Sequence, residues 1–429
     1  MNNVIKSPRG TRDILPDEAI KWSNLEMIAR AIFTQLNYQE IRTPIFEETT
    51  LFRRGIGEGT DIVSKEMYNF IDQGKRELTL RPEGTAGVVR SFIQNQLDKN
   101  KLINRLWYCG PMFRYERPQG GRQRQFHQLG VECLGTNNAY SDFEVISLAC
   151  NFLNALDLNN FKLEINSIGD FNDRQQYIAL LKDFLNNYKD DLDQDSLDKL
   201  STNPLRILDT KNTKTREILK EAPILSDFLS YQSQQHFESL CEYLSFANID
   251  YDINSQLVRG LDYYTYTAFE IKNSNLGSQD TICGGGRYNS LVKQLKGPDI
   301  PAVGWGMGLE RLLLLLENQQ SSKAQALDFY LITLGQNLDC SMIQLGDILK
   351  KSGFTCEFDI TSSRIQKKIK RANQLNAFGC IIVGEEELKR EEITIKWLSS
   401  GRQVNVALND LHILKRLYLE ENLYLFNSV

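Results

Sequence analysis

Arginine and glutamate alternate along one stretch of the chain in a way that suits a phosphorylated ligand. This stretch, Phe113–Arg117, leads through a bend rich in glycine and arginine to a second stretch, Arg124–Glu132. Residues two apart on a strand face the same side of a sheet, so Arg114 and Glu116 would share one face. A guanidinium group binds a phosphate or carboxylate through paired hydrogen bonds, and a carboxylate accepts hydrogen bonds from amines. Such paired charges fit a nucleoside triphosphate beside a small cationic substrate and suggest a ligase.

The second stretch and the bend supply further candidates. Phe126, Gln128 and Glu132 would lie on one face of the returning strand, where a ring can stack on a base and polar groups can bind a small ligand. The bend, 117–124, carries three arginines in eight residues around a Gly-Gly pair. Loops of this kind clamp phosphates or contact the end of a nucleic acid. Taken alone, a cross-strand ion pair and a solvated loop would explain the same residues.

Two other stretches combine residue types that can bind a charged ligand. Glu83 and Thr85 stand at a Pro-Gly turn after a strand-like segment, and a carboxylate beside a hydroxyl suits an ammonium group. An ordinary turn has the same composition. In 257–265, Arg259 and two tyrosines surround a glycine, and such an arginine can neutralise charge that develops on phosphorus. A structural Tyr-Arg cluster is the alternative.

Three glycine-rich stretches would let the backbone approach a ligand closely. They are Gly55–Gly59, Gly284–Gly286 and Gly304–Gly308. The last has the spacing G-x-G-x-G, which differs from the dinucleotide-binding G-x-G-x-x-G, and the first lacks the lysine of a P-loop. We therefore exclude both motifs, and for Gly55–Gly59 a flexible loop that closes over the substrate is a sufficient interpretation.

These residues need a sheet to position them. Apolar residues at three- and four-residue spacing predict a helix over 18–36, and an alternating segment at 39–47 with Pro44 predicts an edge strand. The pair could form a surface for a second subunit or pack on its own sheet. Short turns between the next strands favour an antiparallel sheet. These strands are predicted at Met67–Asp72, Glu77–Leu80, Asn104–Tyr115, Arg124–Leu134 and, after a helix at 141–156, Phe161–Ser167.

The texture changes in the middle of the chain. Between 170 and 250 glycine is absent and the pattern is helical, which predicts a helical insertion; strands resume at 252–257, 263–272 and 280–283. A polar stretch at 318–323 reads as a linker, and alternating strands and helices beyond it predict an α/β domain whose first strands are parallel. The predicted organisation has three parts. An α+β domain is formed by 1–169 and 251–320, the helical insertion between them is 170–250, and the α/β domain is 324–429.

Composition restricts the classes of protein that remain. The net charge of −5 provides no global basic field, so any RNA contact must rest on local patches. The 8 cysteines form no C-x-x-C pair and only 3 histidines accompany them, which argues against zinc and for reduced thiols in a cytoplasmic protein. No signal segment opens the chain and no apolar run could cross a bilayer, so we expect no membrane association.

Taken together and in this order, the segments resemble class II aminoacyl-tRNA synthetases, specifically the histidyl-tRNA synthetase family. The resemblance covers nearly the whole chain. The first helix and the Pro44 strand resemble the dimer-forming first motif of class II enzymes, Phe113–Glu132 the second and Gly304–Arg311 the third. Leu257–Tyr264 and Gly284–Tyr288 resemble the two signatures specific to histidine. The resemblance implies the class II synthetase fold, a C-terminal anticodon-binding domain and a homodimer.

The resemblance also implies an activity and a role for each residue. L-histidine would be activated by ATP to histidyl-adenylate with release of pyrophosphate, and histidine would then pass to the 3′ end of tRNA(His). The catalytic residues would be Arg114 and Arg259. ATP would be bound by Arg114, Glu116, Arg122, Phe126 and Arg311. Histidine would be bound by Glu83, Thr85, Arg114, Gln128, Glu132, Arg259, Leu261, Tyr263, Tyr264 and Tyr288. The tRNA would be contacted by Gln119, Arg124, Arg364, Lys367 and Lys368. Mg²⁺ would link the phosphates of ATP, and no protein side chain is assigned to it.

Two other functions share part of this pattern. A non-catalytic, histidine-sensing regulatory subunit of histidine biosynthesis would keep the synthetase-like core, usually without the C-terminal domain and with degraded motifs. A module that senses uncharged tRNA would have a ruined ATP site. The chain keeps both the C-terminal domain and the arginines of the motifs. One departure is Gly120, where relatives often carry a lysine, so one cation within reach of a phosphate is missing.

Overall fold

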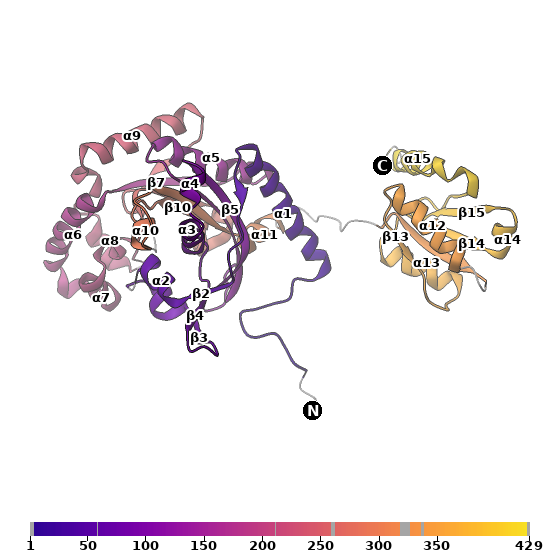
Figure 1. Ribbon diagram of the computed structural model, residues 1–429, viewed down its shortest axis with the longest axis horizontal. Helices are drawn as coiled ribbons and strands as arrows, with labels where there is room; N and C mark the ends of the chain where they lie inside the picture. Colours follow the sequence, from indigo (N-terminus) through magenta and orange to yellow (C-terminus); the bar gives the residue numbers. More distant parts are fainter. Residues whose placement is uncertain are drawn as a thin grey trace. The chain divides into compact units, whose positions relative to one another are not determined.

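The computed structural model describes residues 4–57, 59–210, 212–258, 262–317, 327–335 and 339–426. The chain divides into two compact units, Met1–Ser321 and Ser322–Val429, each described below by itself (Figure 1). The predicted linker at 318–323 lies outside the described residues.

A mostly antiparallel eight-stranded sheet forms the centre of the first unit. Its order is β1-β5-β6-β11-β10-β9-β7-β8, and only the pairs β1·β5 and β7·β8 are parallel. The strands are β1 (Gln39–Glu40), β5 (Asn104–Phe113), β6 (Gln125–Leu134), β7 (Lys162–Gly169), β8 (Asp252–Ile253), β9 (Thr265–Lys272), β10 (Thr281–Arg287) and β11 (Ala302–Gly308). The predicted antiparallel sheet is confirmed.

One face of this sheet carries a large apolar core. Trp107, Val131 and Trp305 lie side by side across β5, β6 and β11, and each is at most 2% exposed. Alternation along the strands turns their neighbours to the opposite face. The helices that contribute to this core are α1 (Pro16–Gln35), α5 (Ala139–Ala155), α9 (Tyr231–Phe246) and α11 (Leu309–Glu317). Shorter helices and the cavity described below lie on the other face.

Glycine occupies the rows of the opposite face in the centre of the sheet. Gly304 and Gly286 continue the row of Glu132, and Gly306 and Gly284 continue the row of Gly130. These two glycine-rich stretches form the interior of β10 and β11. A Cβ atom on Gly304 would lie 1.8 Å from Oε2 of Glu132, so the neighbouring side chain leaves room there for glycine alone.

The strand predicted at 39–47 is divided. Its ends are β1 and β2 (Phe46–Glu48), and β2 belongs to a separate sheet of order β2-β4-β3 with β4 (Glu77–Leu80) and β3 (Tyr68–Ile71). Pro44 has no N–H to donate to a ladder. The carbonyl of Thr43 accepts instead from Nη1 of Arg81 at 3.0 Å, which fixes the bend. Short helices complete this side of the unit: α2 (Thr49–Ile56), α3 (Thr85–Gln94), α4 (Leu97–Asn100) and α10 (Leu291–Gln294).

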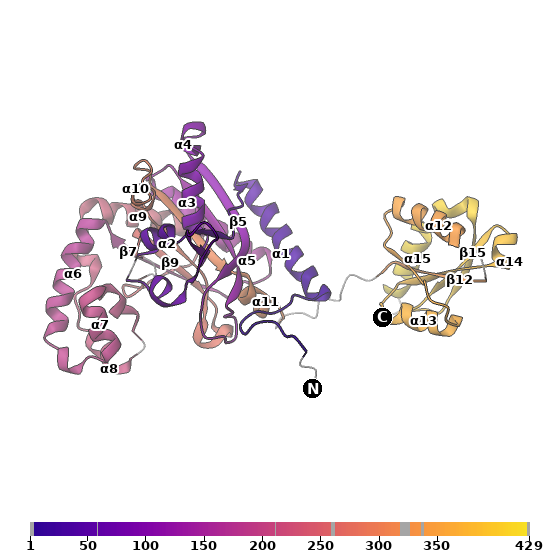
Figure 2. The same cartoon turned by 60° about the horizontal axis from the view of Figure 1, so that its bottom comes forward.

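The segment predicted as a helical insertion is helical. It consists of α6 (Phe171–Asn186), α7 (Gln194–Thr202), α8 (Thr213–Leu219) and α9, with 3₁₀ turns that include Pro204–Asp209. Figures 1 and 2 show α6, α7 and α8 grouped on the side of the first unit opposite α1. Among the described residues, no helix is long and apolar enough to cross a membrane.

The second unit is a five-stranded sheet of order β13-β12-β14-β15-β16. The first three are parallel neighbours and the rest antiparallel, as the alternation of elements predicts. Its elements are β12 (Phe329–Leu334), α12 (Asp339–Lys351), β13 (Cys356–Phe358), α13 (Ile365–Gln374), β14 (Gly379–Gly384), α14 (Glu385–Lys389), β15 (Glu392–Trp397), β16 (Gln403–Ala407) and α15 (Leu414–Phe426).

Candidate active site

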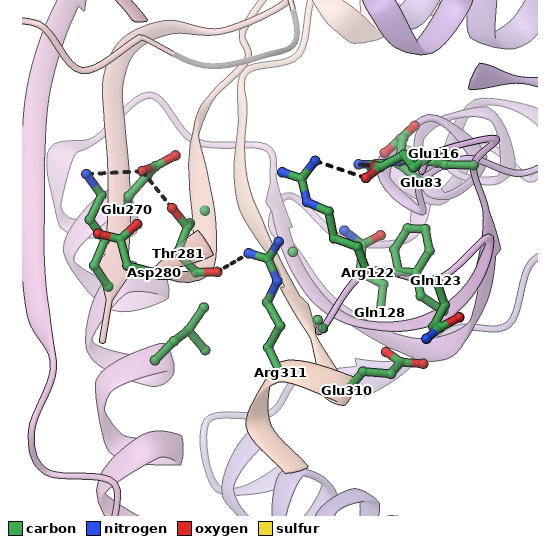
Figure 3. Close-up of a pocket in the computed structure, with 18 of the residues that line it drawn as sticks. Glu83, Glu116, Arg122, Gln123, Gln128, Glu270, Asp280, Thr281, Glu310 and Arg311 are labelled. Atoms are coloured by element: carbon green, nitrogen blue, oxygen red, sulfur yellow. Dashed lines mark hydrogen bonds and ion pairs between the residues drawn. The ribbon is translucent and has the colours of Figure 1, made fainter. Parts of the chain in front are cut away.

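A cavity of about 410 Å³ opens over the glycine-rich face of the large sheet (Figure 3). The elements around it are far apart in the sequence: the start of α3, the end of β5 with the loop to β6, strands β9 to β11, and the start of α11. Because the central strands carry glycines on this face, the cavity can reach down to the backbone of the sheet.

A buried carboxylate lies at one end of this cavity. Glu132 is 0% exposed; its Oε1 accepts from the Thr85 hydroxyl at 2.6 Å and its Oε2 from the Tyr288 hydroxyl. Burial raises the pKa of Glu132 to about 8, while the two hydroxyl donors oppose the change and the charge of Glu83 adds to it. A buried carboxylate with such neighbours favours a ligand that brings hydrogen-bond donors.

A second carboxylate stands at the start of α3. Glu83 accepts from the backbone N–H of Thr85 at 2.6 Å and of Ala86 at 2.9 Å, the first two residues of the helix, whose N–H groups have no partner within it. Burial raises its pKa, although both backbone donors favour the charged form. The amide oxygen of Gln128 accepts from the N–H of Gly84 at 3.1 Å, which ties the turn to β6. This end of the cavity therefore presents acceptors to a ligand.

Guanidinium groups occupy the other part of the cavity. Arg114 donates from Nε to the carbonyl of Pro82 at 2.8 Å and lies 5.2 Å from the centre of the Phe126 ring. Arg122 donates to Glu116 at 3.0 Å, and Arg311 donates to the carbonyl of Thr281. Burial, followed by the charge of Arg122, lowers the pKa of Arg311. Carboxylates also line the cavity, but three guanidinium groups held close together can bind an anionic ligand through paired hydrogen bonds.

The structure brings together most of the residues selected from the sequence. Those that line the cavity are Glu83, Thr85, Arg114, Glu116, Arg122, Phe126, Gln128, Tyr263, Tyr264 and Arg311. Glu132 and Tyr288 lie behind this lining, at 0% and 1% exposure, and Glu132 meets it through Thr85. Arg259 and Leu261 lie outside the described residues.

The residues selected for tRNA are distributed over both units. In the bend, Gln119 bridges to Arg122, and Arg124 lies 3.7 Å from the centre of the Tyr115 ring while its N–H donates to the carbonyl of Gly10. In the second unit, Arg364 and Lys367 are exposed at the start of α13.

Lys368 is not part of a solvated basic face, and its assignment to tRNA is corrected. Its side chain is 7% exposed, and Nζ donates to the carbonyl of Thr333 at 3.2 Å and lies 3.8 Å from Asp359. Arg371 from the next turn also reaches Asp359, at 3.3 Å. Lys368 and Arg371 are three positions apart on α13 and therefore share one face of the helix. That face contacts Asp359, so the side chain of Lys368 lies against the sheet.

One wall of the cavity was not predicted from the sequence. On β9 and its neighbour β10, Glu270 accepts from the hydroxyl of Thr281 at 3.1 Å and lies 3.6 Å from Lys272 (Figure 3). Alternation along β9 next to the Gly284 stretch was a signal that could have identified Glu270 and Lys272. Asp209 of the insertion also lines the cavity, and no sequence signal pointed to it.

Comparisons with known proteins agree with this arrangement. Residues 10–312 match a family model described as histidyl-tRNA synthetase, and residues 328–414 match one described as an anticodon binding domain. A histidine–tRNA ligase of Acaryochloris marina is 51% identical over 95% of both chains, and a chloroplastic one of Pyropia yezoensis is 52% identical over 99% of this chain and 98% of its own. The crystal structure of apo S. aureus histidyl-tRNA synthetase is 37% identical, with a TM-score of 0.80, and the match covers 95% of this chain and 98% of that one.

Proposed function

The chain belongs to the histidyl-tRNA synthetase family, and from this premise we propose how its residues carry out the two steps of a histidine–tRNA ligase. The observation that carries the proposal is a single cavity with guanidinium groups in one part and buried acceptors in the other. ATP fits the first part and histidine the second. The carboxylate of histidine would then meet the α-phosphate where the two parts join.

Arg114 is the group that we assign to the junction. Its Nε donates to the carbonyl of Pro82, which fixes the plane of the group before the ligand arrives. Its Nη1 lies 3.9 Å from Oε1 of Glu116, and this long contact would give way to the ligand. In adenylate formation, the histidine carboxylate attacks the α-phosphorus and pyrophosphate leaves. Preorganised donors at the pentavalent phosphorus stabilise the charge that develops there. Arg259 stays a prediction for the opposite side of the phosphorus.

The adenine subsite is proposed between Phe126 and Arg311. The ring of Phe126 supplies one stacking face, the guanidinium of Arg311 supplies the other, and Glu116 accepts from the adenine amine. In the structure Glu116 accepts from Arg122 at 3.0 Å. Binding of ATP would therefore release Arg122 from this ion pair, so that it can contact the outer phosphates.

The histidine subsite is proposed around the buried acceptors. Glu83, Thr85 and Gln128 would receive the α-ammonium group, and Glu132 with Tyr264 would contact the imidazole. The pKa of Glu132 is about 8, so without a ligand its carboxyl group keeps a proton at neutral pH. An imidazole N–H that donates to this group would favour its ionised form. A substrate without such a donor would forgo this charge-assisted bond in a buried site, which can give discrimination of about 10⁴ or more. Leu261, Tyr263 and Tyr288 complete the predicted set.

Magnesium is proposed to arrive with ATP. Among the described residues, no group of three or more His, Cys, Asp or Glu side chains could hold a metal ion. Carboxylate oxygens of the type that Mg²⁺ accepts do line the cavity at Glu270 and Asp280. One or two such ligands, completed by water and phosphate oxygens, are what Mg²⁺ commonly takes in nucleotide sites, so the residues fit this ion.

The second step and the partners follow from the same premise. Histidine would pass from the adenylate to the 3′ end of tRNA(His), with the bend that carries Gln119 and Arg124 at the acceptor end and the second unit at the anticodon. A homodimer through α1 and β2 is supported by exposed apolar side chains on both: Met27 is 62% and Phe46 52% exposed. The cytoplasmic location stays a prediction, since two relatives are chloroplastic.

Exchange of labelled pyrophosphate into ATP tests the activation step. We expect exchange that depends on histidine and on Mg²⁺, and charging of tRNA(His) by the same preparation. A regulatory subunit would bind histidine and show no exchange. That result would contradict the proposed function.

A further inference from the structure

The helical insertion holds one edge of the proposed histidine subsite. Asp262 and Tyr264 lie just before β9 in the chain. Side chains from the insertion contact both residues. Arg174 on α6 donates from Nη1 to the carbonyl of Tyr264 at 2.7 Å and to that of Asp262 at 3.4 Å. Asn203, at the end of α7, donates from Nδ2 to Oδ1 of Asp262 at 2.8 Å. These contacts connect residues 88, 90 and 59 positions apart in the chain.

Arg174 is placed by a well-defined start of α6. Asp170 and Asp173 form a reciprocal capping box there, and Asp173 also accepts from the N–H and hydroxyl of Ser230 at 3.0 and 3.1 Å. Gly169 just before has φ +64°, and a Cβ atom on it would lie 2.5 Å from Asp173. The turn from β7 into α6 therefore leaves Arg174 little freedom of position, because its backbone is fixed on both sides.

The bonds of Arg174 are of a kind that positions a backbone. Its hydrogen bonds go to main-chain carbonyls rather than to a carboxylate, and burial lowers its pKa. A buried guanidinium is costly to desolvate, so its bonds to two carbonyls are needed to offset that cost. The two carbonyls belong to residues on either side of Tyr263, so the contact fixes the path of the segment that carries both tyrosines.

Asn203 begins the part of the insertion that reaches the cavity itself. It precedes the 3₁₀ turn Pro204–Asp209, in which Arg206 lies 3.6 Å from Oδ1 of Asp262 and Asp209 lines the cavity. On its other side, Asp262 donates its N–H to the carbonyl of Ile56 at 3.3 Å. Asp262 is thus held between the insertion and the end of α2.

Tyr264 connects the contacts of Arg174 and Asn203, together called the clamp below, to the proposed histidine subsite. Its side chain is 5% exposed and lines the main cavity; it also lines a small pocket shared with Arg174, Asn203 and Asp262. A shift of the insertion relative to the sheet would therefore move a residue of the histidine subsite, whereas Phe126 and Arg311 lie on other elements. Displacements of about 1 Å are enough to cost a site much of its efficiency.

We propose that Arg174 and Asn203 of the helical insertion are positioning residues for the histidine subsite, acting through Asp262 and Tyr264. The inference rests on the proposed function, because it names the part of that site which the insertion controls. Neither residue contacts the substrate. Loss of either contact should weaken histidine binding and leave ATP binding as it is.

The test uses the full-length protein and pyrophosphate exchange, with KM measured separately for histidine and for ATP. The variants are Asn203→Ala, Asn203→Asp and Arg174→Met, with Arg174→Lys to keep the charge if the methionine variant does not fold. Matched controls are Asn186→Ala and Arg216→Met, which alter exposed residues of the same insertion. Thermal unfolding of each variant reports on the fold independently of activity.

We expect Asn203→Ala and Arg174→Met to raise the KM for histidine about tenfold, the usual effect of losing a buried hydrogen bond to a charged partner. Asn203→Asp should be worse than the alanine variant, since it places a carboxylate against Asp262. The KM for ATP and both controls should stay within about twofold of the parent. Combining Asn203→Ala with Asp262→Ala should add less than the two single effects predict.

Each remaining outcome has a defined meaning. If the variants that fold keep the parent KM for histidine, or if both KM values rise together, Arg174 and Asn203 do not position the histidine subsite. If the parent protein itself shows no exchange with histidine, the proposed function fails first, and direct calorimetric binding of histidine to parent and Asn203→Ala then tests the clamp alone. Equal affinities in that measurement would overturn the inference.

Discussion

Replacement of Glu132 by glutamine should make the stability of the protein less dependent on pH. The ordinary pKa of the carboxyl group is 4.5 and burial raises it to about 8 in the folded protein. Between these values the unfolded chain releases the proton and the folded chain keeps it, so the parent protein loses stability as pH rises from about 4.5 to about 8. Below that range both states are protonated and the penalty is absent.

The size of the effect follows from the same two values. At about 1.36 kcal/mol for each pKa unit, the difference between 4.5 and about 8 corresponds to on the order of 5 kcal/mol when both states are ionised, and to on the order of 3 kcal/mol at neutral pH. Glutamine does not titrate, and its carbonyl can still accept from one of the two hydroxyls at the site. The free energy of unfolding of the variant, relative to that of the parent, should therefore increase by this amount as pH rises.

Urea unfolding of parent and Glu132→Gln between pH 5 and pH 8 measures this gain. Tryptophan fluorescence follows the first unit well, because Trp22, Trp107 and Trp305 lie in its core. The matched control is Glu48→Gln, an exposed carboxyl group on β2. If the difference in unfolding free energy between parent and Glu132→Gln were the same at both ends of the pH range, the buried carboxyl group would not have the raised pKa on which our account of the histidine subsite depends.

Three further predictions test other parts of the site. Arg114→Lys should lower the rate of adenylate formation in single-turnover experiments by about 10²-fold or more with unchanged melting, since lysine cannot keep the bond to Pro82 and also bridge two anions; an unchanged rate would refute the assignment. Gly304→Ala should abolish histidine binding or folding, because the added methyl would lie 1.8 Å from Oε2 of Glu132, and a normal histidine KM would contradict the described packing. In the second unit, Lys367→Met should weaken tRNA binding without loss of stability, whereas Lys368→Met should lower the melting temperature because it leaves Asp359 with one fewer cation; the reverse pattern would contradict the corrected assignment.

Local patterns in the sequence predicted much of the first unit. The turn at Glu83 is a short-range feature of this kind. Arg114 and Glu116 were predicted on one strand, and this is wrong because β5 ends at Phe113, although both residues line the cavity. The later part of β10 and the whole of β11 were not predicted as strands, because glycine has a low intrinsic preference for strands. Only the neighbouring Glu132 and Gln128 side chains explain why these strands carry glycine.

Contacts between distant segments could not be predicted in the same way. The insertion reaches the cavity through Asp209, and nothing in a helical segment rich in Asn, Asp and Lys separates that residue from a solvated one. Lys368 shows the opposite case, a cation in a basic run whose position on α13 turns it toward Asp359 and the sheet. In both cases the tertiary arrangement, rather than local spacing, decides whether the charge is exposed.

Exchange of labelled pyrophosphate into ATP with each of the standard amino acids, followed by charging of purified tRNA(His), tests the central claim most directly. The account predicts exchange with histidine, none above background with the others, and transfer of histidine to tRNA(His) by the same protein. Histidine binding without exchange, or exchange that prefers another amino acid, would contradict it.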